Sequence, residues 1–440
     1  MVSFYQEKPK QLPPAVEGVC SGLDLTGRGI VQLKAGVYFA PGLLPGERAR
    51  VQVKNERQHE LRVLKLLQQS PQRRSLEDWC SRCGGCPLRH APPELILEAK
   101  TAGLKRLFER SWGVKLPPPA QVAASVTDGY RRACRLALRV DRGVLKLGLR
   151  APLSHEIVSL EHCPVLTDRL NSLLPSLRSL LETLPSRHRL GHVDLLDSDG
   201  APAVSLHFAS QPQTDDLSRL KAWGEREQVA VFCSEVAALG SGDLQALTPS
   251  LRCFVCCAGR EVACTPEDFV QVNAAVNEEL VKWVIQCCQP QAGQLIWDLY
   301  SGLGNFAFAL HEHGATVKAV ELLEAMVVQG NETARRLGLE GIAFYRDDLD
   351  KDFSEAAWAQ QCGDLALLDP GRKGAANAFT ALLRLKVPRI VLVSCNPQAA
   401  AADLKELLGR KGYEIINWAV FDMFPGTTHV ETVCLLTHRG

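Results

Sequence analysis

The chain of 440 residues is long enough for about three domains, and its 46% hydrophobic and 22% charged residues are typical of a globular protein. This composition excludes a wholly disordered chain. No run of eighteen apolar residues and no secretory hydrophobic region is present, so we expect a cytoplasmic protein without a membrane partner. In a reducing compartment, the sixteen cysteines are expected to be thiols, metal ligands or nucleophiles.

The net charge of +1 conceals two opposite excesses. Residues 1–150 carry 26 Lys and Arg against 13 Asp and Glu, a net +13, whereas the remaining 290 residues carry 24 against 36, a net −12. A basic N-terminal third joined to an acidic remainder is typical of a polyanion-binding module attached to another activity. The charge pattern therefore favours a nucleic-acid partner over a merely solvated surface.

The N-terminal region, residues 15–68, alternates short apolar runs with glycine and proline turns, which predicts a small β-barrel. The clearest strands are expected at 29–33, 36–39, 48–53 and 61–67. Basic side chains along them favour nucleic-acid binding over a passive solubilising face.

The following region begins with a polar, cysteine-rich stretch at 70–89. Apolar residues at helical spacing predict helices within 93–113 and 165–184. Arginine-rich segments around 130–140 and 144–149 predict strands, and residues 190–260 predict mixed strands and helices without recognisable chemistry.

From residue 294 onward the pattern changes to alternating strands and helices. Each of four apolar runs precedes a helical segment, and these runs lie at 295–300, 316–320, 364–368 and 389–394. Such alternation predicts an open, mostly parallel α/β sheet. Ligands bind outside the carboxyl ends of strands in these sheets, so the residues after each run are candidates for a site.

One cysteine motif, Cys80, Cys83 and Cys86, is complemented by a distant Cys163 that precedes a proline. Three thiolates at two-residue gaps with a remote fourth ligand favour an iron–sulfur cluster. A structural zinc site more often uses two separated pairs of ligands. Zinc and free thiols remain the alternatives, and the other cysteines outside strand ends are expected to be small buried residues.

A Gly-x-Gly turn, DLYSGLGN at 298–305, follows the apolar run at 295–297. Glycine lets a backbone approach a ligand closely, and Glu321 at the end of the next run can accept hydrogen bonds from a ribose diol. The third glycine of the dinucleotide fingerprint is missing. The turn therefore favours S-adenosylmethionine or a mononucleoside over NAD, with a packing turn as the alternative.

Three further strand ends carry reactive groups. Cys395 follows the run at 389–394, where a helix N-terminus would activate a thiol nucleophile, although a lone cysteine there is equally consistent with a structural role. Asp369 follows the run at 364–368, and the turn at 422–431 carries Asp422 and Glu431. A nucleophile and carboxylates at the strand ends of one sheet indicate an active site.

Five motifs together resemble the RNA uracil-5 methyltransferases over nearly the whole chain: CGGC at 83–86, FVQVN at 269–273, DLYSGLGNF at 298–306, SCNP at 394–397 and HVE at 429–431. The resemblance is greatest to the branch that methylates 23S ribosomal RNA, which carries a TRAM barrel, a [4Fe-4S] cluster and a central domain opening with Tyr-Arg-Arg, here at 130–132. It implies a TRAM/OB-like barrel at 1–69, a central α+β domain at 70–262 and a class I Rossmann-like methyltransferase domain at 263–440.

The resemblance also implies roles for single residues in methyl transfer from S-adenosyl-L-methionine to C5 of a uridine. Cys395 matches the nucleophile that adds to C6, and Glu431 matches the base that removes the C5 proton. The positions that match the cofactor contacts are Gln271, Tyr300, Asn305, Glu321, Asp348 and Asp369, with Asp347 as a neighbouring candidate for the adenine contact. The matching cluster ligands are Cys80, Cys83, Cys86 and Cys163, with a shorter first gap than is usual in the family.

We expect a monomer that methylates ribosomal RNA. Other functions remain alternatives. A transfer RNA methyltransferase is the nearest, but that branch typically lacks the barrel and the cysteine motif. A non-catalytic RNA-binding factor with the same fold would have no need of Cys395, Asp369 and Glu431. A zinc-stabilised oxidoreductase is disfavoured by the missing third glycine.

Overall fold

The computed structural model describes residues 13–235, 244–410 and 412–439. The chain forms two compact units: one comprises residues 1–77, 86–106 and 426–428, and the other comprises residues 78–85, 107–425 and 429–440. Within the described residues, no helix has both the length and the apolar character needed to cross a membrane.

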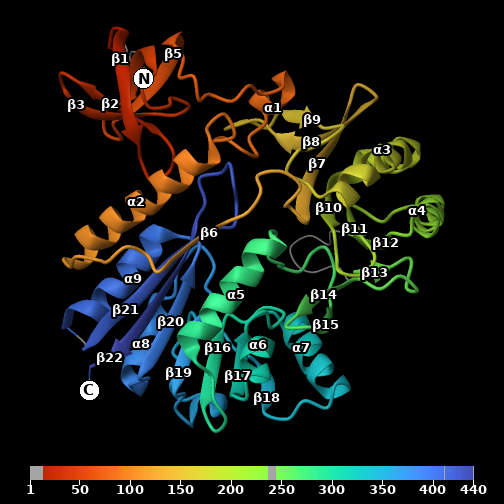
Figure 1. The fold of residues 1–440 in the computed structure, drawn as a ribbon. Helices are drawn as coiled ribbons and strands as arrows, with labels where there is room; N and C mark the ends of the chain where they lie inside the picture. Colours follow the sequence, from red (N-terminus) through yellow and green to blue (C-terminus); the bar gives the residue numbers. More distant parts are fainter. Residues whose placement is uncertain (1–12, 236–243, 411, 440) are drawn as a thin grey trace, which may run out of the picture. The chain divides into compact units, whose positions relative to one another are not determined.

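The first unit contains a closed five-stranded barrel (Figure 1). Its order is β1-β2-β3-β5-β4, with the strands at Val16–Leu23, Gly29–Leu33, Gly36–Ala40, Arg48–Asn55 and Glu60–Gln68. Alternate side chains such as Val31, Ala49 and Val51 form the core. The predicted barrel is confirmed. The sequence analysis did not single out β1, because Glu17, Gly18, Ser21 and Gly22 interrupt its apolar residues.

A buried ion pair joins the barrel to the segment that follows it. The Glu47 side chain is fully buried, and Arg73 donates to both of its carboxylate oxygens, with Nε to Oε1 at 2.6 Å and Nη2 to Oε2 at 2.7 Å. The backbone N–H of Leu44 also donates to Oε2 at 2.8 Å. Although burial opposes ionisation, these hydrogen bonds hold the pKa of Glu47 below its usual value.

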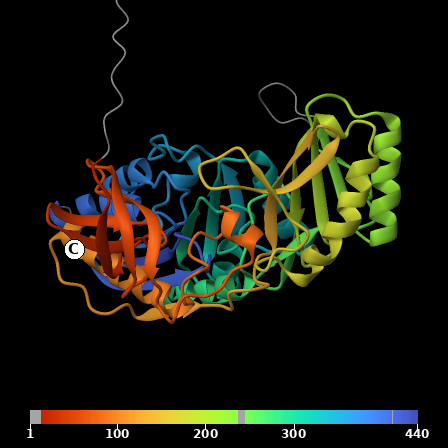
Figure 2. The ribbon, with the colours of Figure 1, turned by 90° about the horizontal axis from the view of Figure 1, so that it is seen from above.

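The second unit holds a seven-stranded sheet of order β13-β12-β11-β10-β7-β8-β9. These strands are, in chain order, Ala133–Asp141, Val144–Arg150, Ile157–Ser159, Leu190–Leu196, Ala203–Phe208, Ala230–Glu235 and Gln245–Ala246. Two helices, α3 (Asp168–Thr183) and α4 (Thr214–Glu227), lie together along one face of this sheet (Figure 2). The predicted helix within 165–184 is confirmed.

The helix predicted within 93–113 is α2 (Pro93–Trp112), and a short α1 spans Asp78–Arg82.

A polar network crosses this sheet where the sequence showed no chemistry. Arg135 of β7 donates to Asp194 of β10 with Nε to Oδ1 at 2.7 Å and Nη2 to Oδ2 at 2.9 Å. His207 of β11 contacts Asp194 Oδ2 through Nε2 at 3.0 Å and Ser234 of β12 through Nδ1 at 2.9 Å. His192 stacks on His207 with ring centroids 4.3 Å apart. Because Arg135 already neutralises Asp194, we interpret the network as a structural link between four strands.

The same unit contains an eight-stranded sheet of order β18-β17-β16-β19-β20-β22-β21-β6. Its strands are, in chain order from β6, Gln121–Ala124, Leu295–Leu299, Thr316–Glu321, Ile342–Arg346, Leu365–Leu368, Arg389–Ser394, Tyr413–Asp422 and Glu431–His438. β16 to β20 pair in parallel, whereas β22 is antiparallel to β20 and β21. The four predicted apolar strands are therefore β16, β17, β19 and β20, and the predicted α/β sheet is confirmed.

Helices and one hairpin accompany this sheet: α5 (Ala274–Cys288), α6 (Ala307–Glu312), α7 (Glu324–Arg336), α8 (Ala376–Leu385), α9 (Pro397–Arg410) and the hairpin of β14 (Phe254–Cys257) with β15 (Arg260–Ala263). The hairpin, the helices α5, α6 and α7 and the sheet share one continuous apolar core. The edge strand β6 pairs in parallel with β21, although it precedes the other strands of the sheet by a long stretch of chain.

We expect Glu47→Ala to lower the free energy of unfolding of the first unit by about 3 kcal/mol, because it leaves the Arg73 guanidinium without its carboxylate partner. Chemical unfolding of the full chain at pH 7 measures this loss. In the native protein the same stabilisation should be lost as the pH falls through the lowered pKa of Glu47. The matched control is Glu60→Ala, which removes a surface pair with Lys54 and should cost less than about 1 kcal/mol. Equal losses of unfolding free energy in the two variants would contradict a specific stabilising role of the buried Glu47–Arg73 pair.

Candidate active site

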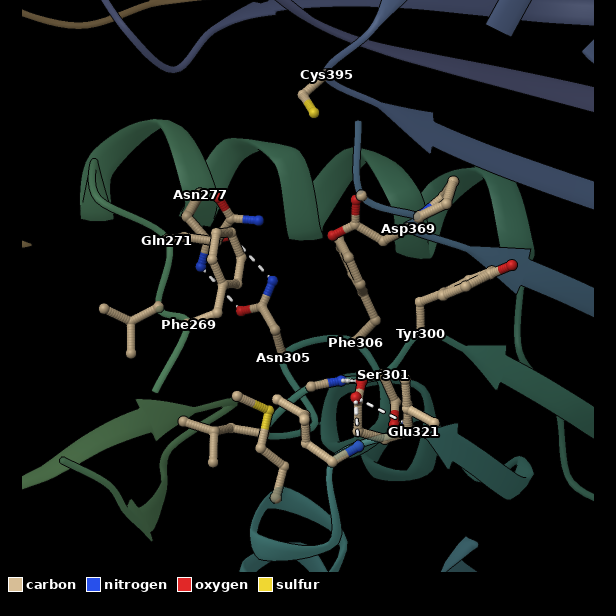
Figure 3. Close-up of a pocket in the computed structure, with 18 of the residues that line it drawn as sticks. Phe269, Gln271, Asn277, Tyr300, Ser301, Asn305, Phe306, Glu321, Asp369 and Cys395 are labelled. Atoms are coloured by element: carbon tan, nitrogen blue, oxygen red, sulfur yellow. Dashed lines mark hydrogen bonds between the residues drawn. The ribbon is translucent and has the colours of Figure 1, made fainter. Parts of the chain in front are cut away.

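A cavity of about 590 Å³ opens at the carboxyl ends of the parallel strands in the second unit (Figure 3). Its volume falls in the range of small-molecule sites. All of the residues that the family resemblance assigned to catalysis and to the cofactor line this one cavity: Gln271, Tyr300, Asn305, Glu321, Asp347, Asp348, Asp369, Cys395 and Glu431. Asp422, the other carboxylate that the sequence analysis offered, is buried and is not among the lining residues.

The sheet topology explains why these residues meet. Tyr300, Asp369 and Cys395 directly follow the parallel strands β16, β19 and β20, and Glu321 ends β17. Carboxyl ends of parallel strands lie at the same edge of a sheet. Glu431 is the first residue of β22, which runs antiparallel to β20, so its strand begins at the edge where the others end.

The glycine turn is shaped for a ligand at one position and for packing at another. Gly302 has a φ of +54°, and a Cβ added there would meet no atom within 4 Å, so its backbone is open. At Gly304, with a φ of +90°, a Cβ would lie 2.8 Å from Phe308 and Phe344. Tyr300 also has a positive φ, +62°, which is strained for a residue with a side chain and is typical of functional sites. Its buried hydroxyl has no hydrogen-bond partner among the described residues.

Backbone groups fix the carboxylate of Glu321. Oε1 accepts hydrogen bonds from the N–H groups of Leu322 at 2.8 Å and Leu323 at 2.9 Å, and Oε2 accepts one from Gly302 at 3.1 Å (Figure 3). Each carboxylate oxygen has two lone pairs. Oε2 therefore keeps one acceptor site for a ligand hydroxyl.

The structure adds Asn277 to the site, a residue that the sequence analysis missed. Asn277 of α5 and Asn305 of the glycine turn exchange two amide hydrogen bonds of 2.9 Å each. This reciprocal pair fixes the orientation of the Asn305 amide at the cavity wall (Figure 3). Asn277 lies one helical turn after Asn273, the N-cap of α5, and no sequence pattern connects it with the turn.

The electrostatics at Cys395 are dominated by burial and by two acidic neighbours. Burial raises the pKa of the Cys395 thiol to about 11, and the charges of Glu431 and Asp369 act in the same direction, whereas Arg372 opposes them. Burial also raises the pKa of Asp369 and of Glu431, and the charge of Asp369 raises that of Glu431 further. Glu431 is only 5% exposed.

Such an arrangement can hold and move protons near neutral pH. Two carboxyl groups in one buried space resist double ionisation, so the pair retains a proton at a pH where exposed carboxyl groups have lost theirs. A carboxyl group with a raised pKa is an efficient general base near neutrality. The thiol is predominantly protonated at rest, and its attack as a thiolate requires a proton acceptor.

Three of the predicted cluster cysteines belong to the second unit: Cys80 in α1, Cys83 just after it and Cys163 after β9. Burial raises the pKa of Cys83, and the charges of Cys163 and Cys80 add to the effect, so the three thiols are neighbours. The N–H of Gly85 points to Cys83 Sγ at 3.4 Å. Cys86 belongs to the other unit. All sixteen cysteines lie in described residues, and none forms a disulfide.

The parallel sheet, its glycine turn and the carboxylate after the next strand define a class I methyltransferase domain. The fold is that of the Pyrococcus abyssi tRNA (uracil-54, C5)-methyltransferase, whose structure with S-adenosyl-L-homocysteine has a TM-score of 0.74, 22% identity, and covers 96% of this chain and 100% of that one.

Residues 94–439 match the family described as tRNA (Uracil-5-)-methyltransferase, and the chain belongs to this family. The predicted resemblance is thus confirmed. Among its curated relatives are two 23S rRNA (uracil(1939)-C(5))-methyltransferases. The one from Tolumonas auensis is 35% identical over 100% of both chains. The one from Pectobacterium atrosepticum is 36% identical over 95% of this chain and 92% of the relative.

We expect Asp369→Asn to lower the pKa of Glu431, because it removes the neighbouring charge while burial persists. In infrared difference spectra, the carbonyl stretch of the protonated Glu431 should therefore disappear at a lower pH than in the native protein. Glu431→Gln identifies this band by removing it. Asp350→Asn, at an exposed position of the same cavity, is the matched control. A shift of equal size in the control would refute a specific coupling between Asp369 and Glu431.

Proposed function

We propose that the protein transfers a methyl group from S-adenosyl-L-methionine to C5 of a uridine in 23S ribosomal RNA. The observation that carries this proposal is the convergence of Cys395, Asp369 and Glu431 in the cavity that also contains the glycine turn. Relatives that align over nearly the full chain act on 23S rRNA by name, which supports ribosomal over transfer RNA as the substrate.

Cys395 acts as the nucleophile. Uracil C5 is a poor nucleophile, and addition of a thiolate to C6 converts C5 into an enolate-like carbon that can accept a methyl group. Cys395 is partly exposed to the cavity and lies beside two carboxyl groups that can take its proton. Arg372 is the cationic neighbour that favours the thiolate.

Glu431 acts as the base that ends the reaction. After C5 has accepted the methyl group, its proton must be removed so that the Cys395–C6 bond can break. Burial and the charge of Asp369 raise the pKa of Glu431, which suits a base that works near neutral pH. Asp369 is thereby positioned both to raise the pKa of Glu431 and to border the uracil ring that reacts.

The cofactor supplies an electrophilic sulfonium methyl group, and the chain holds it at the glycine turn. Glu321 Oε2 would accept a ribose hydroxyl, and Tyr300, Asn305 and Gln271 would line the rest of the cofactor.

Asp348 is the better candidate for the adenine contact than Asp347. Asp347 Oδ2 already accepts a hydrogen bond from Trp358 Nε1 at 2.8 Å. Asp348 pairs at 3.1 Å with Lys351, whose side chain is largely exposed and free to move away. A carboxylate that can exchange a mobile lysine for the adenine amino group suits this contact.

The exposed basic side chains of the barrel support the proposal that the protein binds RNA. Arg50 of β4 and Lys65 of β5 are direct cross-strand neighbours, and Arg48 and Arg62 are exposed on the same two strands. Adjacent cations on a small barrel are suited to follow a phosphate backbone.

We further propose that Cys80, Cys83, Cys86 and Cys163 hold a [4Fe-4S] cluster. Three thiolates at two-residue gaps with a remote fourth ligand favour this cluster over a structural zinc site, which more often uses two separated pairs of ligands. The Gly85 N–H aimed at Cys83 Sγ supports a thiolate ligand of a cluster, whose properties depend on such hydrogen bonds.

The proposed reaction is tested with the Glu431→Gln variant and labelled S-adenosylmethionine. Native protein should place label in one fragment of unmodified 23S rRNA as 5-methyluridine, seen by mass spectrometry. Glu431→Gln should instead accumulate a protein–RNA adduct that survives denaturation, because C5 is methylated but its proton stays in place.

Cys395→Ala is the matched control. It should form no adduct and no product, with RNA affinity nearly unchanged, because it removes only the attacking sulfur. Label found only in transfer RNA would show that the substrate is transfer RNA and not 23S rRNA. Substantial methylation by Cys395→Ala would refute the covalent mechanism.

For the cluster, we expect Cys83→Ala to lose bound iron and acid-labile sulfide together, because one ligand of four is removed. Metal analysis of anaerobically purified protein measures both. Cys256→Ala, at an exposed cysteine outside the motif, should retain the native content. Zinc in place of iron in the native protein would overturn the cluster assignment.

A further inference from the structure

Two cysteines outside the active-site chemistry form a close pair at the base of the hairpin β14–β15. Cys253 directly precedes β14, and Cys264 directly follows β15. The register pairs Phe254 with Ala263, which makes the two cysteines the next cross-strand pair. The N–H of Cys264 donates to the carbonyl of Cys253 at 3.1 Å, and the two Sγ atoms lie 3.8 Å apart.

We propose that Cys253 and Cys264 are a thiol modification site that hydrogen peroxide converts to an intramolecular disulfide. A disulfide bond is about 2.05 Å long, so the sulfurs need to approach by less than 2 Å. The site lies in the hairpin that borders the cavity through Val255, Cys256 and Cys257. This inference rests on the cysteine geometry alone and is independent of the proposed methyl transfer.

The surroundings divide the two thiols into an attacking and a resolving sulfur. The hydrogen bond with Cys264 lowers the pKa of Cys253 although burial opposes it, and the nearby Arg132 acts in the same direction. The same hydrogen bond, together with burial, raises the pKa of Cys264. A thiolate, rather than a thiol, reacts with peroxide. These directions favour first oxidation at Cys253 with Cys264 as the resolving thiol, whereas the disulfide itself depends on the 3.8 Å separation of the two sulfurs and forms in either order.

The chemistry balances with one molecule of peroxide. The Cys253 thiolate attacks a peroxide oxygen, an S–O bond forms, the O–O bond breaks, and the departing hydroxide takes up a proton as water. Cys264 sulfur then attacks the sulfenic sulfur of Cys253, an S–S bond forms, and the S–O oxygen leaves as a second water with the Cys264 proton. The two thiols lose two electrons and two protons.

Burial selects the oxidant. Cys253 is 7% exposed and Cys264 is 6% exposed, so a bulky disulfide such as oxidised glutathione has no direct access. Hydrogen peroxide is little larger than water and enters through small local openings of the fold. Cys287 and Cys288 provide a comparison within α5: both are buried, but consecutive residues of a helix do not face each other.

The test treats the folded full-length protein with hydrogen peroxide, quenches it with catalase, alkylates it in denaturant and analyses an unreduced digest by mass spectrometry. We expect a linked pair of peptides containing Cys253 and Cys264, lighter by two hydrogen atoms than the sum of its parts. This link should be at least about tenfold more abundant than any link through Cys287 or Cys288. Cys287→Ser is the matched control and should leave the link unchanged.

Single variants separate the two sulfurs. With dimedone present, which traps sulfenic acids, Cys264→Ser should carry the label on Cys253, because the resolving thiol is absent. Cys253→Ser should leave Cys264 unlabelled. Recovery of both native cysteines as alkylated thiols would overturn the proposal. Links from either cysteine to a third one would overturn it equally.

Discussion

The active site depends on the confinement of two carboxyl groups, Asp369 and Glu431, beside one partly exposed thiol at the wall of a single cavity. Burial raises the pKa of all three groups, the charge of Asp369 raises that of Glu431, and the charges of both carboxylates raise that of Cys395. The sheet supplies the confinement: β19 and β20 deliver Asp369 and Cys395, and the reversed β22 brings Glu431 to the same edge. If β22 ran parallel to β20, its first residue would lie at the opposite end of the sheet.

Much of this architecture was predictable because buried parallel strands leave a simple trace in a sequence. β19 and β20 are buried over nearly their whole length and appear as continuous apolar runs, and the runs of β16 and β17 are interrupted only by Asp298 and Lys318. The turn and strand-end residues Tyr300, Asn305, Glu321, Asp369 and Cys395 lie at or just after these runs, whereas Gln271 and Asp348 were assigned only through the family resemblance. β1 was missed because Glu17, Gly18, Ser21 and Gly22 interrupt its apolar pattern, and the short β18 was missed although its sequence IAFYR is apolar up to its last residue.

The features that escaped prediction are contacts between segments distant along the chain. The amide pair of Asn277 and Asn305 joins a helix to a turn, and the Asp194 network joins four strands. The pair Cys253 and Cys264 meets only because a hairpin brings the two residues into register. Propensity and periodicity describe each segment separately, whereas these contacts are decided by tertiary packing, which no pattern within one segment records.

The position of β6 has a consequence for how the protein is made. β6 is synthesised before every other strand of its sheet, yet its neighbour among the described strands of that sheet is β21, far along the chain. On the ribosome, β6 therefore cannot form this pairing until residues 413–422 have been made. The pairing of β6 with β21 also joins segments that are far apart in the sequence, and such contacts form slowly. A chain that stops before residue 413 lacks β21, so its strand β6 has no pairing partner in this sheet. The β6–β21 pairing therefore forms only in chains that extend past β21.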